Sequence, residues 1–139
     1  MKYLVDTNVL SEAAKARPNP VVKEWLEKNR SSSYVATITV GEIRYGIEKL
    51  SDEVRKEQLQ KWLHKTLNAL GGRVLGFPIS VAHTWGQMRA KLAKEGMSLP
   101  LADGQIAAVA KHHGLTVVTR NVKDFRLAGI RTLNPFEES

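Results

Sequence analysis

Four acidic side chains stand at places where an α/β protein could use them for chemistry. Asp6 abruptly ends the apolar, β-favouring run at residues 1–5, so a carboxylate lies at the carboxyl end of the first expected strand. Ligands bind at this end of the strands in open α/β sheets, because the loops and helix N-termini there leave a polar crevice. A charge beside a buried strand is costly unless a cation meets it. Asp6 therefore indicates a cation site if other acids converge on it.

Three further acids occupy comparable positions. Glu42 is expected in the first turn of the helix after the second strand, and Asp103 in the first turn of the helix before the fourth strand. Asp124 follows that fourth strand by a few residues. If the sheet brings these acids to Asp6, four carboxylates repel one another, and a hard divalent cation relieves the repulsion. Oxygen-only ligands favour Mg²⁺ or Mn²⁺, and Mg²⁺ needs only one or two direct carboxylates beside its waters.

Each of these acids also has a structural interpretation. Thr39 and Glu42 match a capping box, in which Thr39 caps the helix and Glu42 reaches back to a backbone N–H. Asp103 could simply complement a helix dipole, and Asp124 could be a surface acid. The capping box explains Glu42 at least as well as a functional role does.

Polar residues follow two of the expected strands. Asp6 could cap the helix expected from Asn8, although Asn8 could cap it without placing a charge there. Thr119, Arg120 and Asn121 form a second polar cluster after the fourth strand. Threonine and asparagine can position a water or hold a carboxylate, and Arg120 could meet a phosphate, whereas the structural alternative is a simple turn.

Strand and helix patterns alternate along the chain. Asn19, Ser51 and Ser80 are the expected caps of three helices. No hairpin signal joins two strands, so the pattern predicts crossovers and a mainly parallel sheet in a three-layer α/β domain, with helices flanking the central sheet. The strands are expected at residues 1–5, 34–36, 73–75, 115–119 and 130–133, and the helices at residues 8–16, 20–29, 39–50, 52–69, 81–95 and 101–113.

Length and composition set further bounds. The 139 residues are expected to form one domain, residues 1–139, and the absence of cysteine excludes disulfides and thiolate metal sites. Because the chain shows neither a signal-peptide pattern nor the ~20 apolar residues that cross a membrane, a soluble cytoplasmic protein is expected. The net charge of +7 favours a polyanionic partner such as nucleic acid, although a basic solvated surface explains it equally well. Lysine and arginine are dispersed, so any basic face must be built by folding.

Several common catalytic motifs are missing. The sequence contains no H-E-x-x-H, G-x-S-x-G or P-loop motif, which argues against zincins, α/β-hydrolases and P-loop NTPases. A metal-dependent phosphohydrolase with a paired Asp-x-Asp motif is also disfavoured, because Asn8 stands two residues after Asp6.

Five segments, in order, resemble the PIN-domain family. The similarity is greatest to the VapC-like and FitB-like toxins of toxin–antitoxin modules, and it spans almost the whole chain. The resemblance implies a PIN-like α/β fold and a ribonuclease that depends on Mg²⁺, with Mn²⁺ able to serve instead. The segments are residues 4–11, 38–46, 101–110, 119–125 and 134–136.

The resemblance also implies roles for the acids. Asp6, Glu42 and Asp103 fall on the family's acidic motif positions and would be catalytic, with Asp6 and Asp103 as direct metal ligands. Relatives often carry an acid directly after the Thr-Arg pair, where this chain has Asn121. Either Asp124 becomes the fourth catalytic acid through a shifted loop, or Asn121 serves as a neutral ligand to water. The supporting side chains would be Thr7, Asn8, Thr119 and Asn121.

A mechanism and a set of partners follow from the same resemblance. A metal-activated water would hydrolyse the RNA phosphodiester in line, without a covalent enzyme intermediate. A homodimer and a small antitoxin are implied, with operator DNA contacted only through the antitoxin. The competing interpretation, which Asn121 keeps open, is a nucleic-acid-binding or regulatory module whose acids are structural. The candidate phosphate contacts are Arg44, Arg89, Lys91 and Arg120.

Overall fold

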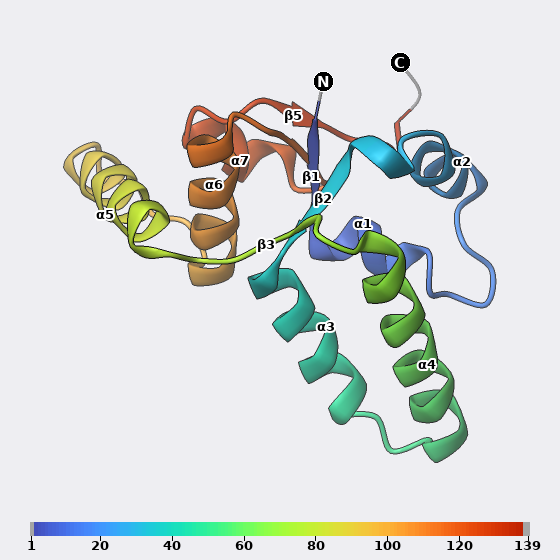
Figure 1. Ribbon diagram of the computed structural model, residues 1–139. Helices are drawn as coiled ribbons and strands as arrows, with labels where there is room; N and C mark the ends of the chain where they lie inside the picture. The colour runs from blue at the N-terminus through green and yellow to red at the C-terminus, as the bar shows by residue number, and fades with distance from the viewer. Residues whose placement is uncertain (1, 138–139) are drawn as a thin grey trace.

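The computed structural model describes residues 2–137 and shows a parallel sheet between two layers of helices (Figure 1). The strands are β1 (Tyr3–Val5), β2 (Ser33–Ala36), β3 (Val74–Leu75), β4 (Thr116–Val118) and β5 (Thr132–Leu133). The α-helices are α1 (Thr7–Glu12), α2 (Pro20–Lys28), α3 (Thr37–Glu48), α4 (Glu53–Leu70), α5 (Ile79–Lys94), α6 (Leu101–His113) and α7 (Val122–Leu127), and a short 3-10 helix, Arg30–Ser32, precedes β2. This arrangement confirms the expected fold class.

The order of the strands determines where the acids can meet. The sheet has the order β3-β2-β1-β4-β5, and its pairings in the described part of the chain are parallel. The chain builds β2 and β3 outward on one side of β1, and then crosses back to build β4 and β5 on the other side. The strand order therefore reverses between β1 and β4. In sheets of this kind the carboxyl ends of the two strands at the reversal border the ligand-binding crevice.

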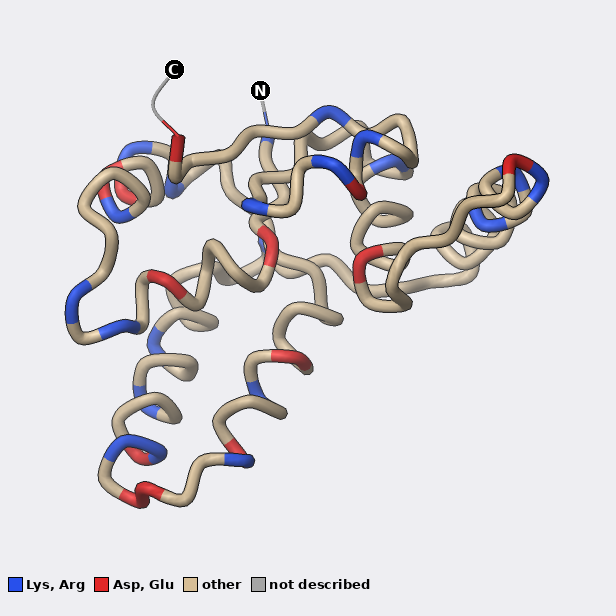
Figure 2. Tube along the Cα trace, turned by 180° about the vertical axis from the view of Figure 1, so that it is seen from behind, with Lys and Arg blue, Asp and Glu red and all other residues tan. Residues whose placement is uncertain are grey.

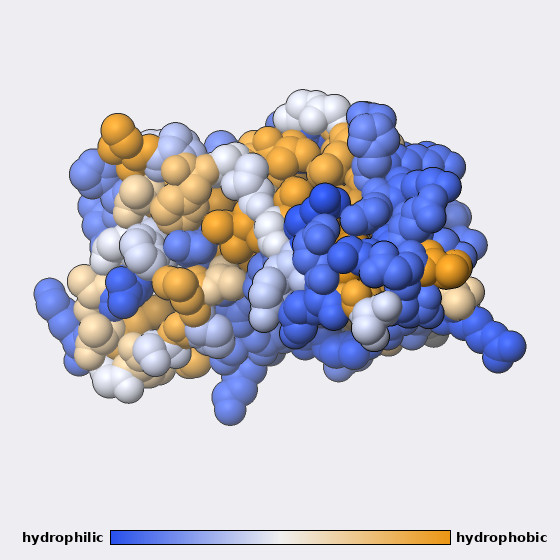
Figure 3. Space-filling model, turned by 90° about the horizontal axis from the view of Figure 1, so that it is seen from below, coloured by the Kyte–Doolittle hydropathy of each residue, from blue (hydrophilic) through white to orange (hydrophobic). Residues whose placement is uncertain are grey.

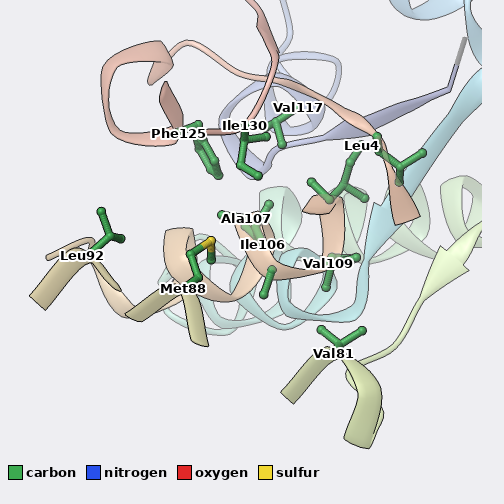
Figure 4. Packing of buried hydrophobic residues seen from close by; sticks show 14 residues of the cluster. Leu4, Val81, Met88, Leu92, Ile106, Ala107, Val109, Val117, Phe125 and Ile130 are labelled. Carbon is green, nitrogen blue, oxygen red and sulfur yellow. The ribbon is translucent and has the colours of Figure 1, made fainter. Parts of the chain in front are cut away.

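Successive residues of the strands face opposite helical layers. Leu4 and Val117 contribute to a core with α5, α6 and α7, whereas Val5 and Val118 contribute to a second core with α1 to α4. Because side chains alternate across a strand, one short strand can serve both layers. Figure 4 shows the first core, where residues of α5 and α6 lie near residues of the sheet and Phe125 of α7. The expected three-layer architecture is thus confirmed.

Several helix ends differ from the sequence predictions. Asn19 caps α2 as predicted, but α4 is capped by Asp52 and not by Ser51. Helix α5 starts after Pro78, so Ser80 lies inside its first turn and is not the cap. Helix α1 ends at Glu12, four residues before the expected end. The six-residue helix α7 was not predicted, because so short a segment shows no sustained helical period.

The surface is mixed and not dominated by one basic segment. Lysine and arginine are distributed over most of the helices and loops (Figure 2), as their dispersal along the sequence predicts. Seen from below, hydrophilic residues dominate around the free ends of α3 and α4, whereas apolar residues are more visible toward α5 and α6 (Figure 3). Within residues 2–137, no helix combines the length and apolar character needed to cross a membrane.

Candidate metal centre

Asp6 lies at the carboxyl end of β1, where the strand order reverses. Its side chain is buried and accepts hydrogen bonds from the Thr7 backbone N–H at 2.8 Å, the Thr119 hydroxyl at 2.7 Å and the Asn8 amide at 3.3 Å. Burial raises the pKa of Asp6 above its ordinary value, and these hydrogen bonds oppose the rise. Asp6, and not Asn8, is also the N-cap of α1. Asp6 therefore has the structural role of a helix cap, and the same carboxylate stands at the strand end where a cation site was predicted.

The turn after β4 connects Asp6 to two of the other acids. Thr119 is fully buried, and its hydroxyl donates to Asp6 while accepting the backbone N–H of Asn121 at 2.9 Å. The side-chain amide of Asn121 donates to Asp103 at 3.0 Å and to Asp124 at 2.9 Å. This segment is therefore more than a simple turn, because two of its side chains hold three carboxylates.

Asp103 lies in the first turn of α6, and Asp124 in the first turn of α7. Burial, followed by the charges of Asp6 and Asp124, raises the pKa of Asp103 to about 6, although the hydrogen bond from Asn121 opposes the rise. Asn121 and Asp124 were the two candidates for the fourth position of the acidic site, and both adjoin Asp103. The presence of one side chain at the site therefore does not exclude the other.

Glu42 contacts the site from α3, but not through a capping box. Helix α3 begins at Thr37, so Glu42 lies in its second turn, and the N-cap residue Ala36 makes no side-chain hydrogen bond. Thr39 is fully buried, and its hydroxyl has no hydrogen-bond partner within the described residues. The exposed carboxylate of Glu42 instead accepts a 2.7 Å hydrogen bond from the Thr7 hydroxyl. The capping-box interpretation was therefore wrong.

Within residues 2–137, the acids of this site form no ion pair with a lysine or arginine side chain. The five ion pairs found within residues 2–137 join lysine or arginine to other carboxylates. The charge of Glu42 contributes to the raised pKa values of Asp6 and Asp103, which shows that the carboxylates repel one another. Carboxylate and amide oxygens together with excess negative charge fit Mg²⁺ or Mn²⁺.

The site is open and not a complete metal cage. Over residues 2–137, no group of three or more histidine, aspartate or glutamate side chains is arranged to hold a metal ion by itself. Magnesium usually keeps several waters and takes one or two protein carboxylates. The donor set therefore fits a hydrated divalent cation, and it does not resemble a closed structural site.

Arg120 is attached to the site by its backbone. It directly follows Thr119, and its backbone N–H donates to the Asn8 side-chain oxygen at 3.2 Å. Its guanidinium carbon lies 3.6 Å from the ring centroid of Phe136. No role was predicted for this ring from the sequence, although an aromatic residue in the 134–136 segment was a signal that could have suggested one.

The other three basic candidates lie on helices α3 and α5. Arg44 forms an ion pair with Glu48 at 3.1 Å on α3. On α5, Arg89 stacks over Trp85 at 4.9 Å from the ring centroid, and Lys91 is exposed. None of these three side chains makes a hydrogen bond or an ion pair with the acids of the site within the described residues.

The fold and the site together define a class of protein. It is an α/β protein whose parallel sheet carries a carboxylate-rich centre at the reversal of strand order, with donors suited to a divalent cation. The model of the PIN domain matches residues 3–130. The chain belongs to the PIN-domain family, as its sequence motifs predicted.

Relatives match along the whole chain. The VapC ribonuclease Y4jK of Sinorhizobium fredii is 36% identical over 136 residues, which cover 96% of this chain and 97% of the relative. The toxin FitB of Neisseria gonorrhoeae is 37% identical over 137 residues, which cover 97% of this chain and 99% of the relative. The crystal structure of FitAcB from Neisseria gonorrhoeae matches with a TM-score of 0.92 at 37% identity, over 98% of this chain and 99% of that chain.

Proposed function

We propose that this protein is a Mg²⁺-dependent endoribonuclease, with Mn²⁺ able to serve instead, and that it acts as the toxin of a toxin–antitoxin module. The observation that carries the proposal is the connected set of Asp6, Glu42, Asp103 and Asp124, which adjoins the ends of β1 and β4 and forms no ion pair with lysine or arginine within residues 2–137. Membership of the PIN-domain family and full-length similarity to a VapC ribonuclease and to the toxin FitB support it.

Asp6 and Asp103 are the proposed direct metal ligands. When bound, the cation supplies charge neutralisation at the scissile phosphate and lowers the pKa of a water. Asp6 is held in one orientation by the hydroxyl of Thr119 and by two N–H donors of the first turn of α1, so little reorganisation is needed when RNA arrives. Asn121 holds Asp103 and Asp124 in the same way.

Glu42 is the proposed proton acceptor for the attacking water. Its carboxylate is exposed, and one of its oxygens, Oε1, is held by the Thr7 hydroxyl. The second oxygen remains available to accept a proton from a water within hydrogen-bond distance. Thr7 therefore orients the base, while the buried carboxylate of Asp6 stays with the ligand set.

The proposed substrate and partners follow from the family. Arg120 is the first candidate for a phosphate contact because its backbone is bonded to the site, and Arg44, Arg89 and Lys91 could extend the contact along an RNA strand. We expect a single domain over residues 1–139, a homodimer, action on cellular RNA in the cytoplasm, and an antitoxin that covers the site and contacts operator DNA itself.

A cleavage assay with two site variants tests the proposal. The purified protein is incubated with RNA in the presence of Mg²⁺ or Mn²⁺ and, separately, of a chelator. Asp6→Asn and Asp103→Asn should each lower cleavage by more than about 100-fold, because loss of a direct ligand should exceed the ~10- to 100-fold cost of losing an outer hydrogen-bond partner. Asp52→Asn is the matched control, since Asp52 also caps a helix but lies at the start of α4.

The outcomes separate the enzyme from the regulatory module. Cleavage that needs the metal, is lost in both site variants and persists in Asp52→Asn supports the proposal. If wild type and both site variants cleave equally, the assigned ligands are wrong. If the wild type binds RNA without cleaving it under any metal, the chain is a binding module whose acids serve the fold.

A further inference from the structure

Asn121 occupies an unusual place for an asparagine. It is the N-cap residue of α7, a position where asparagine normally bonds the first backbone N–H groups of the helix through its side chain. Here the side chain makes no capping hydrogen bond. The amide is directed at Asp124 on the same helix and at Asp103 on α6 instead, so the capping bond is given up for a pair of bonds that joins α7 to α6.

The geometry of the two hydrogen bonds explains why an amide side chain suits this position. Asn121 Nδ2 lies 3.0 Å from Asp103 Oδ2 and 2.9 Å from Asp124 Oδ2, which is hydrogen-bond distance to both. An ionised carboxylate only accepts hydrogen bonds, and an amide nitrogen has two N–H groups to donate. One neutral side chain therefore joins two negative charges without adding a third.

The position of Asn121 is itself secured. Its backbone N–H donates to the Thr119 hydroxyl at 2.9 Å, and that hydroxyl donates to Asp6. Asn121 thus stands at the centre of a chain of hydrogen bonds that reaches three carboxylates on three segments. Movement of Asn121 would disturb Asp6, Asp103 and Asp124 together.

We propose that Asn121 is a positioning residue whose side-chain amide holds Asp103 and Asp124 side by side in the metal-free protein, so that the site is assembled before a cation binds. An aspartate at this place would add a charge and remove both donors, and the site would then depend on the cation for its assembly. The inference rests on the proposed function for its meaning, because it concerns the proposed ligand Asp103. The bridge that the Asn121 amide forms between Asp103 and Asp124 can be tested in the metal-free protein.

A double-mutant cycle in chelator tests the bridge. At about pH 8, where the carboxyl groups are ionised, Asn121→Asp should lower the melting temperature by at least about 5 °C. In the background of Asp103→Asn and Asp124→Asn the same change should cost no more than about 2 °C, because the like charges are gone. Asn68→Asp is the control, since Asn68 is an exposed asparagine of α4 and its change should have a small effect in both backgrounds.

A titration with Mn²⁺ tests the consequence for the site. Asn121→Leu, which removes the amide and adds no charge, should weaken Mn²⁺ binding by roughly tenfold in calorimetry. Asn121→Asp should show a larger rise in melting temperature on addition of Mn²⁺ than wild type does, because the bound cation relieves the repulsion that the added carboxylate creates in the metal-free form.

The results distinguish the inference from the proposed function. Equal costs of Asn121→Asp in the two backgrounds, or unchanged Mn²⁺ affinity in Asn121→Leu, would overturn the positioning role. If Mn²⁺ fails to bind the wild type, the proposed metal-dependent function is contradicted, and the cycle in chelator still decides whether the amide bridges the two acids. If Asn121→Asp costs more in the wild-type background than in the double variant, and if Asn121→Leu binds Mn²⁺ more weakly, then both the positioning role and the proposed function are supported.

Discussion

The hydroxyl of Thr119 donates a 2.7 Å hydrogen bond to Asp6 across a separation of 113 residues in sequence. The bond exists because β4 lies beside β1 in the sheet, so that the carboxyl ends of the two strands meet. Both side chains are buried, and a hydrogen bond to a charged group is strong where water is excluded. This pair therefore links the fold of the sheet to the geometry of the acidic site.

Loss of this hydrogen bond should destabilise the protein measurably. Thr119→Val keeps the shape of the side chain and removes the donor, leaving a buried carboxylate without its shortest hydrogen bond. We expect the free energy of unfolding to fall by about 1.5–3 kcal/mol at neutral pH. Thr116→Val is a matched control, because the Thr116 hydroxyl on β4 is buried and has no partner within the described residues. Urea unfolding of both variants checks the prediction, and equal losses would contradict it.

The stability of the metal-free protein should decrease as the pH rises from about 4.5 to about 7. The ordinary pKa of Asp103 is 3.8, and burial with neighbouring charges raises it to about 6 in the folded protein. In this window the folded chain binds more protons than the unfolded chain, so stability is lost as the pH increases. The raised pKa of Asp6 acts in the same direction. Melting temperatures measured in chelator across this window check the prediction.

The variant Asp103→Asn isolates this effect. Burial lowers the pKa of His113. Its contribution therefore makes the stability of the protein rise with pH as the pH approaches the ordinary histidine pKa of 6.5, opposite to the effect of Asp103. The hydrogen bond with Lys15 is the main cause of the lowered pKa of Glu12. The stability that Glu12 contributes to the protein is therefore lost only below its ordinary pKa of 4.5. Both contributions remain in Asp103→Asn, so the difference between the wild-type and variant profiles reports Asp103. Identical profiles would show that Asp103 titrates normally.

Arg120 should contribute one phosphate contact to RNA binding. Arg120→Ala should weaken the binding of single-stranded RNA in chelator. The plot of the logarithm of the RNA-binding constant against the logarithm of the salt concentration should also become less steep, by roughly 0.7 in slope. Phe136→Leu should have an intermediate effect, because the ring lies under the Arg120 guanidinium. Fluorescence titrations at several salt concentrations measure both.

A second arginine provides the control for this experiment. Arg131 precedes β5 and therefore lies at the amino end of the parallel sheet, away from the strand ends that carry the acids. Arg131→Ala removes the same charge from the protein, and we expect binding to change far less. If both variants weaken binding alike, only the net charge matters and Arg120 has no specific role.

Phe125 should be essential for the stability of the segment that carries Asp124. Its side chain is fully buried in the core that α7 shares with α5 and α6. Phe125→Ala should lower the free energy of unfolding by about 3–5 kcal/mol, because it removes a large buried ring and leaves a cavity. Leu127→Ala on the same helix, at a position 41% exposed, should cost far less. Denaturant unfolding of the two variants gives the comparison.

The ends of the elements could be predicted only where one local signal dominates. Asn19 before Pro20 identified the start of α2, because an N-cap followed by proline has one good solution. Thr39 and Glu42 matched a capping box as clearly as Asn19 and Pro20 matched a helix start. The helix nevertheless starts two residues earlier, and Glu42 accepts a hydrogen bond from the hydroxyl of Thr7, which belongs to another segment. Tertiary contacts decided between local alternatives that the sequence leaves nearly equal in energy.

The sequence by itself determined the fold class and the family, and it predicted which acids the fold brings together. Hydrophobic periods specify strands and helices locally, and an acid at a strand end, such as Asp6, is visible without knowledge of the fold. Only the tertiary structure decided how those acids are held. The strand order places Thr119 beside Asp6, and the start of α7 places Asn121 between Asp103 and Asp124. The Thr119–Asp6 and Asn121–Asp103 contacts join residues that are separated in the chain, so no local pattern could specify them before the sheet was assembled.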